Sequence, residues 1–144
     1  QDASLIINDS GSFQDEWVWL RTAGDRQKKS RCVWAQGLPE KIYLPIAHGE
    51  GKFVVKDQAL MQRIKRNHQI VFQDEDNPNG SSESIAGICD ESGRILGLMP
   101  HPERHMFATQ HPRWTGQAQA IPGAIGDGQH IFNNGVEYAQ KHLL

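Results

Sequence analysis

Short apolar runs, each closed by turn-forming residues, constrain what this chain can fold into more than any other feature. The runs are rich in β-branched and aromatic side chains, and Gly, Pro, Asn or Asp separates them. Such runs are typical of β-strands, which average about five or six residues. The extended segments that we expect lie at 13–20, 32–35, 42–47, 52–55, 70–72, 84–89 and 94–99.

Two stretches have helical periodicity instead. Within 57–66, Leu60 and Ile64 have the spacing of one helix face, and Asp57 is suited to cap the helix. Near the C-terminal end, residues 129–144 also predict a helix, whose apolar face carries Ile131, Phe132, Val136, Ala139 and Leu143. Strands outnumber helices, and the pattern resembles half of an α/β domain.

Length and charge exclude several classes of partner. A chain of 144 residues suits one ordinary domain. Its 15 Lys and Arg nearly balance 17 Asp and Glu, so we expect no nucleic acid partner and no membrane surface. The apolar runs are far shorter than the roughly 20 residues of a membrane span. The basic stretch 21–30 predicts an exposed loop.

The two cysteines, Cys32 and Cys89, do not form a Cys-x-x-Cys pair, and we expect reduced thiols in a cytoplasmic protein. Neither resembles an activated nucleophile. Cys89 follows Gly87-Ile88, but a nucleophile elbow requires a helix immediately afterwards, and a turn and a strand are predicted here. We therefore expect Cys89 to end a strand.

The segment Gly97-Leu98-Met99-Pro100-His101-Pro102-Glu103-Arg104 holds the most suggestive chemistry. Its prolines fix their own φ and push the residues before them toward the extended region. In an extended backbone His101 and Glu103 would point to the same side. A carboxylate beside an imidazole can fix its tautomer and stabilise the imidazolium, as in a nucleophile–base–orienter triad. The same residues would also suit a rigid turn with an exposed histidine.

A metal site is an alternative, because His105 extends the pair to a His-x-Glu-x-His cluster. The His-Glu-x-x-His spacing of helical zinc sites is absent, and the prolines oppose a helix. The cysteine pair of the zinc deaminases is also missing. We therefore expect neither a metal nor another cofactor.

A second candidate element, His48-Gly49-Glu50-Gly51, ends the run 42–47. Two glycines around a carboxylate permit a tight loop in which backbone N–H groups approach a substrate or a partner. A plain strand-ending turn would give the same pattern.

Together these motifs resemble the glutaminase component of phosphoribosylformylglycinamidine synthase, over nearly the whole chain. The His-Pro-Glu element is shared by many class I glutamine amidotransferases, whereas Ala47-His48-Gly49-Glu50-Gly51 narrows the resemblance to this branch. The other matching segments are Asn77-Pro78-Asn79-Gly80-Ser81, Ile85-Ala86-Gly87-Ile88, His111-Pro112-Arg113-Trp114 and Gly126-Asp127-Gly128 with Ile131-Phe132.

The resemblance implies an α/β fold: a flavodoxin-like domain with a mixed sheet and flanking helices, of which residues 1–144 are the C-terminal portion. It further implies that a cysteine thiolate attacks the side-chain amide of glutamine, forms a γ-glutamyl thioester and releases ammonia. The ammonia would pass to an ATP-dependent synthase component in purine biosynthesis. His101 would transfer protons, Glu103 would position His101, and the loop from His48 to Gly51 would contact substrate or partner.

The family's nucleophile elbow lies upstream of the segment that matches residues 2–20. We therefore expect that this chain alone is inactive and that an N-terminal half supplies the cysteine. The alternative function is a docking or assembly module of the synthase without a nucleophile of its own.

Overall fold

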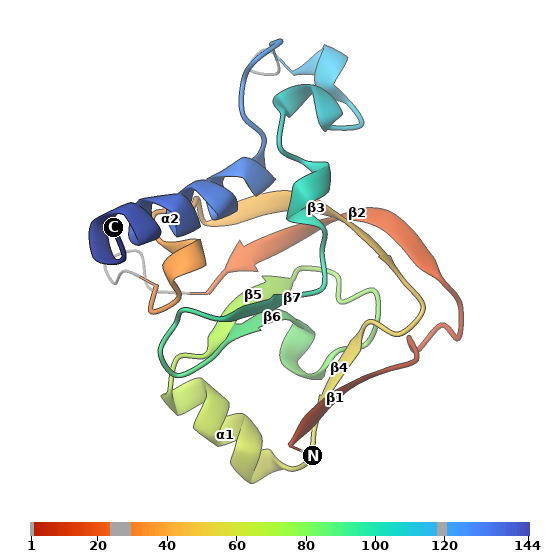
Figure 1. The fold of residues 1–144 in the computed structure, drawn as a ribbon. Coiled ribbons are helices and arrows are strands. Elements are labelled where there is room, and N and C mark those ends of the chain that lie inside the picture. Colours follow the sequence, from red (N-terminus) through yellow and green to blue (C-terminus); the bar gives the residue numbers. More distant parts are fainter. Residues whose placement is uncertain (1, 24–29, 118–120) are drawn as a thin grey trace.

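The computed structural model describes residues 2–23, 30–117 and 121–144, and its strands form two sheets. The larger sheet has the strand order β3-β2-β5-β6-β7, and every neighbouring pair runs antiparallel (Figure 1). The smaller sheet pairs β1 with β4. With two flanking helices this confirms the expected α/β class. The strands are β1 (Ala3–Ile6), β2 (Gln14–Thr22), β3 (Lys41–His48), β4 (Lys52–Val55), β5 (Ile70–Asp74), β6 (Ile85–Cys89) and β7 (Leu96–Leu98).

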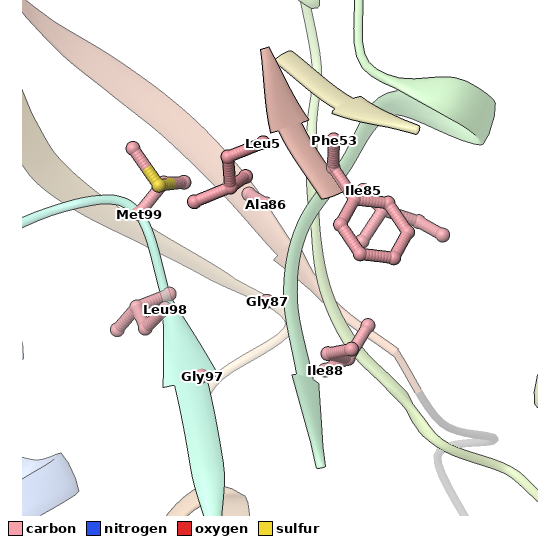
Figure 2. Close-up of a pocket in the computed structure, with 9 residues that line it drawn as sticks. All are labelled: Leu5, Phe53, Ile85, Ala86, Gly87, Ile88, Gly97, Leu98 and Met99. Carbon is pink, nitrogen blue, oxygen red and sulfur yellow. The ribbon is translucent and has the colours of Figure 1, made fainter. Parts of the chain in front are cut away.

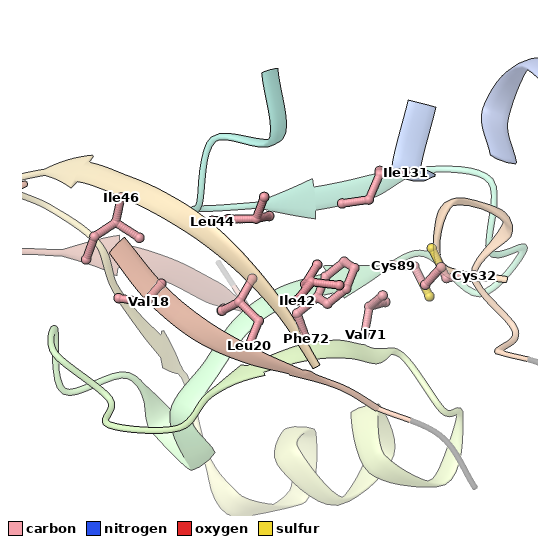
Figure 3. Close-up of a cluster of buried hydrophobic side chains, with 12 residues drawn as sticks. Val18, Leu20, Cys32, Ile42, Leu44, Ile46, Val71, Phe72, Cys89 and Ile131 are labelled. Atoms are coloured by element: carbon pink, nitrogen blue, oxygen red, sulfur yellow. The ribbon is translucent and has the colours of Figure 1, made fainter. Parts of the chain in front are cut away.

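The main core lies on one face of β2 and β3. Directly opposed residues of an antiparallel pair share a face, so Val18 opposite Leu44 and Leu20 opposite Ile42 are buried together (Figure 3). Alternation also places Trp17 and Trp19 together on the other face.

Strand β7 is shorter than the predicted run 94–99 because the preceding turn extends further. The Asp90 carboxylate accepts hydrogen bonds from the backbone N–H groups of Arg94 and Ile95 at 3.0 Å each. These two residues therefore close the turn and the strand begins at Leu96. Strand β1 was not predicted, and residues 24–29 of the predicted basic loop lie outside the described residues.

Helix α1 (Gln58–Arg66) is confirmed together with its cap. The Asp57 carboxylate accepts a hydrogen bond from the Leu60 N–H at 2.8 Å, which satisfies a donor of the first turn. Leu60, Met61 and Ile64 are buried.

Helix α2 (Asp127–His142) starts two residues before the predicted position and lies along β3 (Figure 1). The Asp127 carboxylate accepts a hydrogen bond from the Tyr43 N–H at 2.7 Å and so joins the helix to β3. A Cβ at Gly128 would collide with the Pro102 carbonyl group. The glycine therefore allows the helix to approach the segment that carries His101 and Glu103. Neither helix of the described residues is long and apolar enough to cross a bilayer.

The prediction of a strand at 32–35 is wrong, because Val33–Ala35 forms a 3-10 helix. The Ala35 N–H donates to the Cys32 carbonyl at 3.1 Å, and Asn134 of α2 donates to the Trp34 carbonyl at 3.0 Å. Cys32, Val33 and Ala35 are all buried. A run this short cannot separate a buried strand from a buried turn by its periodicity.

Candidate active site

His101 and Glu103 form a close pair in the folded chain. The His101 Nδ1 atom lies 2.7 Å from a Glu103 carboxylate oxygen. Both side chains reach solvent, with exposed fractions of 31% for His101 and 55% for Glu103. The structure thus brings together the two residues that the sequence selects for proton transfer.

The backbone route to this pair differs from the predicted extended segment. Pro102–Arg104 forms a 3-10 turn in which the Arg104 N–H donates to the His101 carbonyl at 3.1 Å. Proline is well tolerated at the first position of a turn, because it has no N–H group to satisfy there. The expectation of an extended backbone is therefore wrong at Glu103, although its side chain meets His101.

A backbone hydrogen bond fixes His101 relative to the sheet. Its N–H donates to the Pro45 carbonyl in β3 at 2.8 Å. Proline lacks an N–H group, but its carbonyl remains available at this point of the strand. The imidazole is consequently anchored to one of the most buried strands rather than to a free loop.

The contact with Glu103 distinguishes the two ring nitrogens of His101. When Nδ1–H donates to the carboxylate, Nε2 carries the lone pair and can accept a proton. The carboxylate also stabilises the imidazolium that results. This arrangement is suited to general acid–base catalysis on a group that lies against Nε2.

A pocket of about 480 Å³ opens beside the pair, with mostly apolar walls. No cysteine is among its described lining residues, so the pair faces this pocket without a thiol nucleophile. The lining comprises Trp34, Arg94, Ile95, Leu96, Leu98, Met99, Pro100, His101, Pro102, Glu103, Ile131 and Phe132.

Asn8 shapes the loop of His48, Gly49, Glu50 and Gly51. Its side-chain amide donates to the His48 carbonyl at 2.8 Å and accepts from the Gly51 N–H at 2.9 Å. The Asn8 N–H donates to the Gly49 carbonyl at 3.0 Å. The loop is therefore rigidly held, and Glu50 is exposed at its tip.

His48 lies inside this loop rather than on its surface. The side chain is buried, and neither ring nitrogen has a hydrogen-bond partner among the described residues. Burial lowers the pKa of His48, and the charge of His101 lowers it further. A Cβ at Gly51 would collide with the ring, so this glycine is required by a close approach. His48 is therefore an uncharged imidazole close to the His101–Glu103 pair.

Asn79 reinforces the same loop by donating to the Gly51 carbonyl at 2.6 Å. The sequence marks Asn8 only as part of a turn and Asn79 only as part of a matching motif. Their role in holding the loop comes from contacts between distant segments, for which a single sequence carries no local signal.

Both cysteines have environments that disfavour the thiolate. Burial raises the pKa of Cys32 to about 12 and also raises the pKa of Cys89. Cys89 is the last residue of β6, as predicted. Nucleophilic cysteines lie instead in partly exposed surroundings that lower the pKa.

The structure does not bring His105 together with His101 and Glu103. Its Nδ1 atom lies 2.8 Å from the Tyr43 carbonyl, and its ring meets Trp17 edge-on with centroids 5.1 Å apart. His105 therefore faces the aromatic side of β2 and β3 and does not join Glu103. Within the described residues no three His, Cys, Asp or Glu side chains could hold a metal ion together.

The chain belongs to the CobB/CobQ-like glutamine amidotransferase domain family, whose model matches residues 1–139. The His-Pro-Glu segment and its histidine–carboxylate pair lie within this match.

The names of similar proteins are more specific than the family description. The chain is 39% identical to the phosphoribosylformylglycinamidine synthase subunit PurQ of Dehalococcoides mccartyi, over 98% of the chain and 54% of the relative. The PurQ subunit of Archaeoglobus fulgidus is 34% identical over 97% of the chain and 52% of its own length. The chain thus spans about half the length of these relatives.

A solved structure agrees with this assignment. The structure of PurLQS from Thermotoga maritima matches with a TM-score of 0.70 and 30% identity, over 96% of this chain and 53% of that one. The match supports the fold as well as the family.

Proposed function

We propose that this chain is the C-terminal portion of the glutaminase component of phosphoribosylformylglycinamidine synthase. It supplies the base and the orienting carboxylate for hydrolysis of glutamine, in the cytoplasm and without a cofactor. The ammonia released is used by an ATP-dependent synthase component in purine biosynthesis. The 2.7 Å contact between His101 and Glu103 beside an open pocket carries this proposal.

In the proposed reaction a cysteine of another segment enters the pocket beside His101. The imidazole Nε2 takes the thiol proton, and the thiolate attacks the side-chain amide carbon of glutamine. His101 then gives the proton to the leaving nitrogen, so ammonia departs and a γ-glutamyl thioester remains. Glu103 keeps the ring in the productive tautomer throughout. Water then hydrolyses the thioester, which releases glutamate and frees the thiol.

Three features support the view that a further segment completes the site. The chain spans only about half the length of its relatives. The short strand β7 lies at the edge of the five-stranded sheet, where unpaired backbone groups can accept another strand. An apolar pocket of about 330 Å³ lies between β1, β6 and β7, and its walls include Leu5, Phe53 and Leu98 (Figure 2).

The rigid loop at His48, Gly49, Glu50 and Gly51 is the proposed contact with glutamine or with the synthase. Asn8 and Asn79 donate hydrogen bonds to the loop backbone, while Glu50 is exposed to solvent. A preorganised loop contributes binding energy because little conformational entropy is lost when it engages a ligand.

Reconstitution tests the proposal. The 144-residue chain and a separately expressed upstream half that contains a Gly-x-Cys-x-Gly elbow are assayed for glutamate release, alone and mixed. We expect that neither piece alone turns over glutamine and that the mixture does. A matched mixture that carries Cys→Ser at the elbow should be inactive.

Two outcomes would refute the proposed division of roles. The first is glutamine turnover by the isolated chain that is lost in Cys89→Ser, which would place the nucleophile here. The second is an active mixture whose turnover survives His101→Ala, which would leave the chain as a docking module only.

A further inference from the structure

Cys32 and Cys89 come from distant parts of the sequence but meet in the main core. Both are buried, with exposed fractions of 1% and 3%. Both belong to one cluster of packed core side chains, and Figure 3 shows the two sulfur-bearing side chains beside each other. Both are free thiols in the structure.

The backbones on either side of this contact are also joined. The Val33 N–H donates to the Gly93 carbonyl at 2.8 Å, in the turn that follows Cys89. A Cβ at Gly93 would collide with the Arg31 carbonyl, so the two segments approach as closely as a glycine allows. The two cysteines therefore lie on segments that are already packed against each other.

We propose that Cys32 and Cys89 are a modification site at which peroxide forms a reversible intramolecular disulfide. This inference does not depend on the proposed glutaminase function, because neither thiol takes part in that chemistry.

The redox step balances with hydrogen peroxide as the oxidant. The Cys89 thiolate attacks one peroxide oxygen, the O–O bond breaks, and a sulfenic acid forms on Cys89 while hydroxide takes up the thiol proton. The sulfur of Cys32 then attacks the sulfenic sulfur, and hydroxide leaves with the Cys32 proton as water. Two thiols lose two electrons and two protons, and the peroxide is reduced to two waters.

Either thiol can be the first nucleophile, because exchanging the roles of Cys32 and Cys89 leaves the balance unchanged. Burial raises the pKa of both thiols. Because both thiols are buried, we expect slower oxidation than for an exposed, low-pKa thiol. A small oxidant such as peroxide is favoured over a bulky disulfide for the same reason.

The disulfide would act on the wall of the candidate active site. Trp34, two residues after Cys32, lines the pocket beside His101, and its indole N–H donates to the Arg94 carbonyl at 2.8 Å. The link would therefore tie this wall covalently to the hairpin of β6 and β7.

Peptide mapping of the full-length protein tests the proposal. The protein is treated with hydrogen peroxide under native conditions, remaining thiols are alkylated, and tryptic peptides are analysed with and without a reductant. Trypsin releases Cys32 in peptide 32–41 and Cys89 in peptide 67–94. We expect these two peptides linked, lighter by two hydrogen atoms, and separated again by the reductant.

The single variants Cys32→Ser and Cys89→Ser are the matched controls and should each lack the linked species. The oxidised wild type should unfold at a temperature on the order of 5–10 °C higher than the reduced form. Peptides that remain unlinked, with both thiols unreacted or separately oxidised to sulfinic acids, would overturn the proposal. The peroxide treatment is repeated in urea below the unfolding midpoint, so that the oxidant can reach the buried thiols.

Discussion

His101 and His105 lie four residues apart on one segment but have opposite surroundings. His101 is 31% exposed at its side chain and pairs with the Glu103 carboxylate. His105 is 5% exposed, lies against the Tyr43 carbonyl and packs edge-on against Trp17. The same side chain is therefore available for proton transfer in one place and serves packing in the other.

This comparison shows which features make an imidazole reactive. His48 is a third case: its ring is buried, has no hydrogen-bond partner among the described residues, and has a lowered pKa. A buried ring stays uncharged, whereas an open ring that a carboxylate orients can exchange a proton with a bound group. Exposure together with an acidic partner, rather than residue type, selects His101.

The largest expected effect is on catalysis at the open pair. In the reconstituted glutaminase that we propose, His101→Ala should reduce kcat for glutamine hydrolysis about 10²–10⁴-fold, because the proposed general base is lost. Glu103→Gln should cost less, since the base remains and only its orientation is weakened. Steady-state glutamate release measures both, and unchanged turnover in His101→Ala would exclude the proposed role.

The next effect concerns Asp74, a buried carboxyl with an unpartnered oxygen in the described part of the chain. Burial, aided by the charges of Asp76 and Glu16, raises its pKa to about 7. The folded chain therefore binds the proton more tightly than the unfolded chain. Its contribution to the free energy of unfolding is fully present below about pH 4 and is lost as the pH rises through about 7, by about 4 kcal/mol.

Urea unfolding at several pH values checks this sign. In Asp74→Asn the side chain stays neutral, so the difference in stability between variant and wild type should grow in the variant's favour from pH 4 to pH 7. A constant difference across that range would show that Asp74 does not titrate as described.

The packing role of His105 predicts a smaller loss, confined to stability. His105→Ala removes a buried ring between Trp17 and the Tyr43 carbonyl and should lower the free energy of unfolding by about 2–3 kcal/mol. His101→Ala is the matched variant and should change stability much less. Chemical denaturation of both would contradict the comparison if their losses were equal.

The smallest effect tests how closely His48 packs against its loop. Gly51→Ala places a methyl group against the His48 ring and should destabilise the chain by about 1–2 kcal/mol. Gly49→Ala is a matched control, because its Cβ would meet only Phe13 at 3.9 Å. Similar stabilities of the two variants would show that the His48 ring moves aside at little cost.

The sequence predicts most of the strands, both α-helices and the His101–Glu103 pair, because these depend on local patterns. Alternation along β2 and β3, the Asp57 cap and the prolines around His101 are all readable within a few residues. Prediction from the sequence fails where contacts between distant segments determine the local structure, as at Val33–Ala35, which packs against α2. Two further features arise only when separate segments meet. These are the burial of His48 and the hydrogen bonds of Asn8 and Asn79 to its loop.

Nitrogen NMR of isotope-labelled histidine tests most directly whether Glu103 holds His101 as a base. We predict that the neutral His101 ring carries its proton on Nδ1, with Nε2 free, and that Glu103→Gln abolishes this preference. A neutral ring protonated on Nε2, with a spectrum that Glu103→Gln leaves unchanged, would contradict the assignment of the pair.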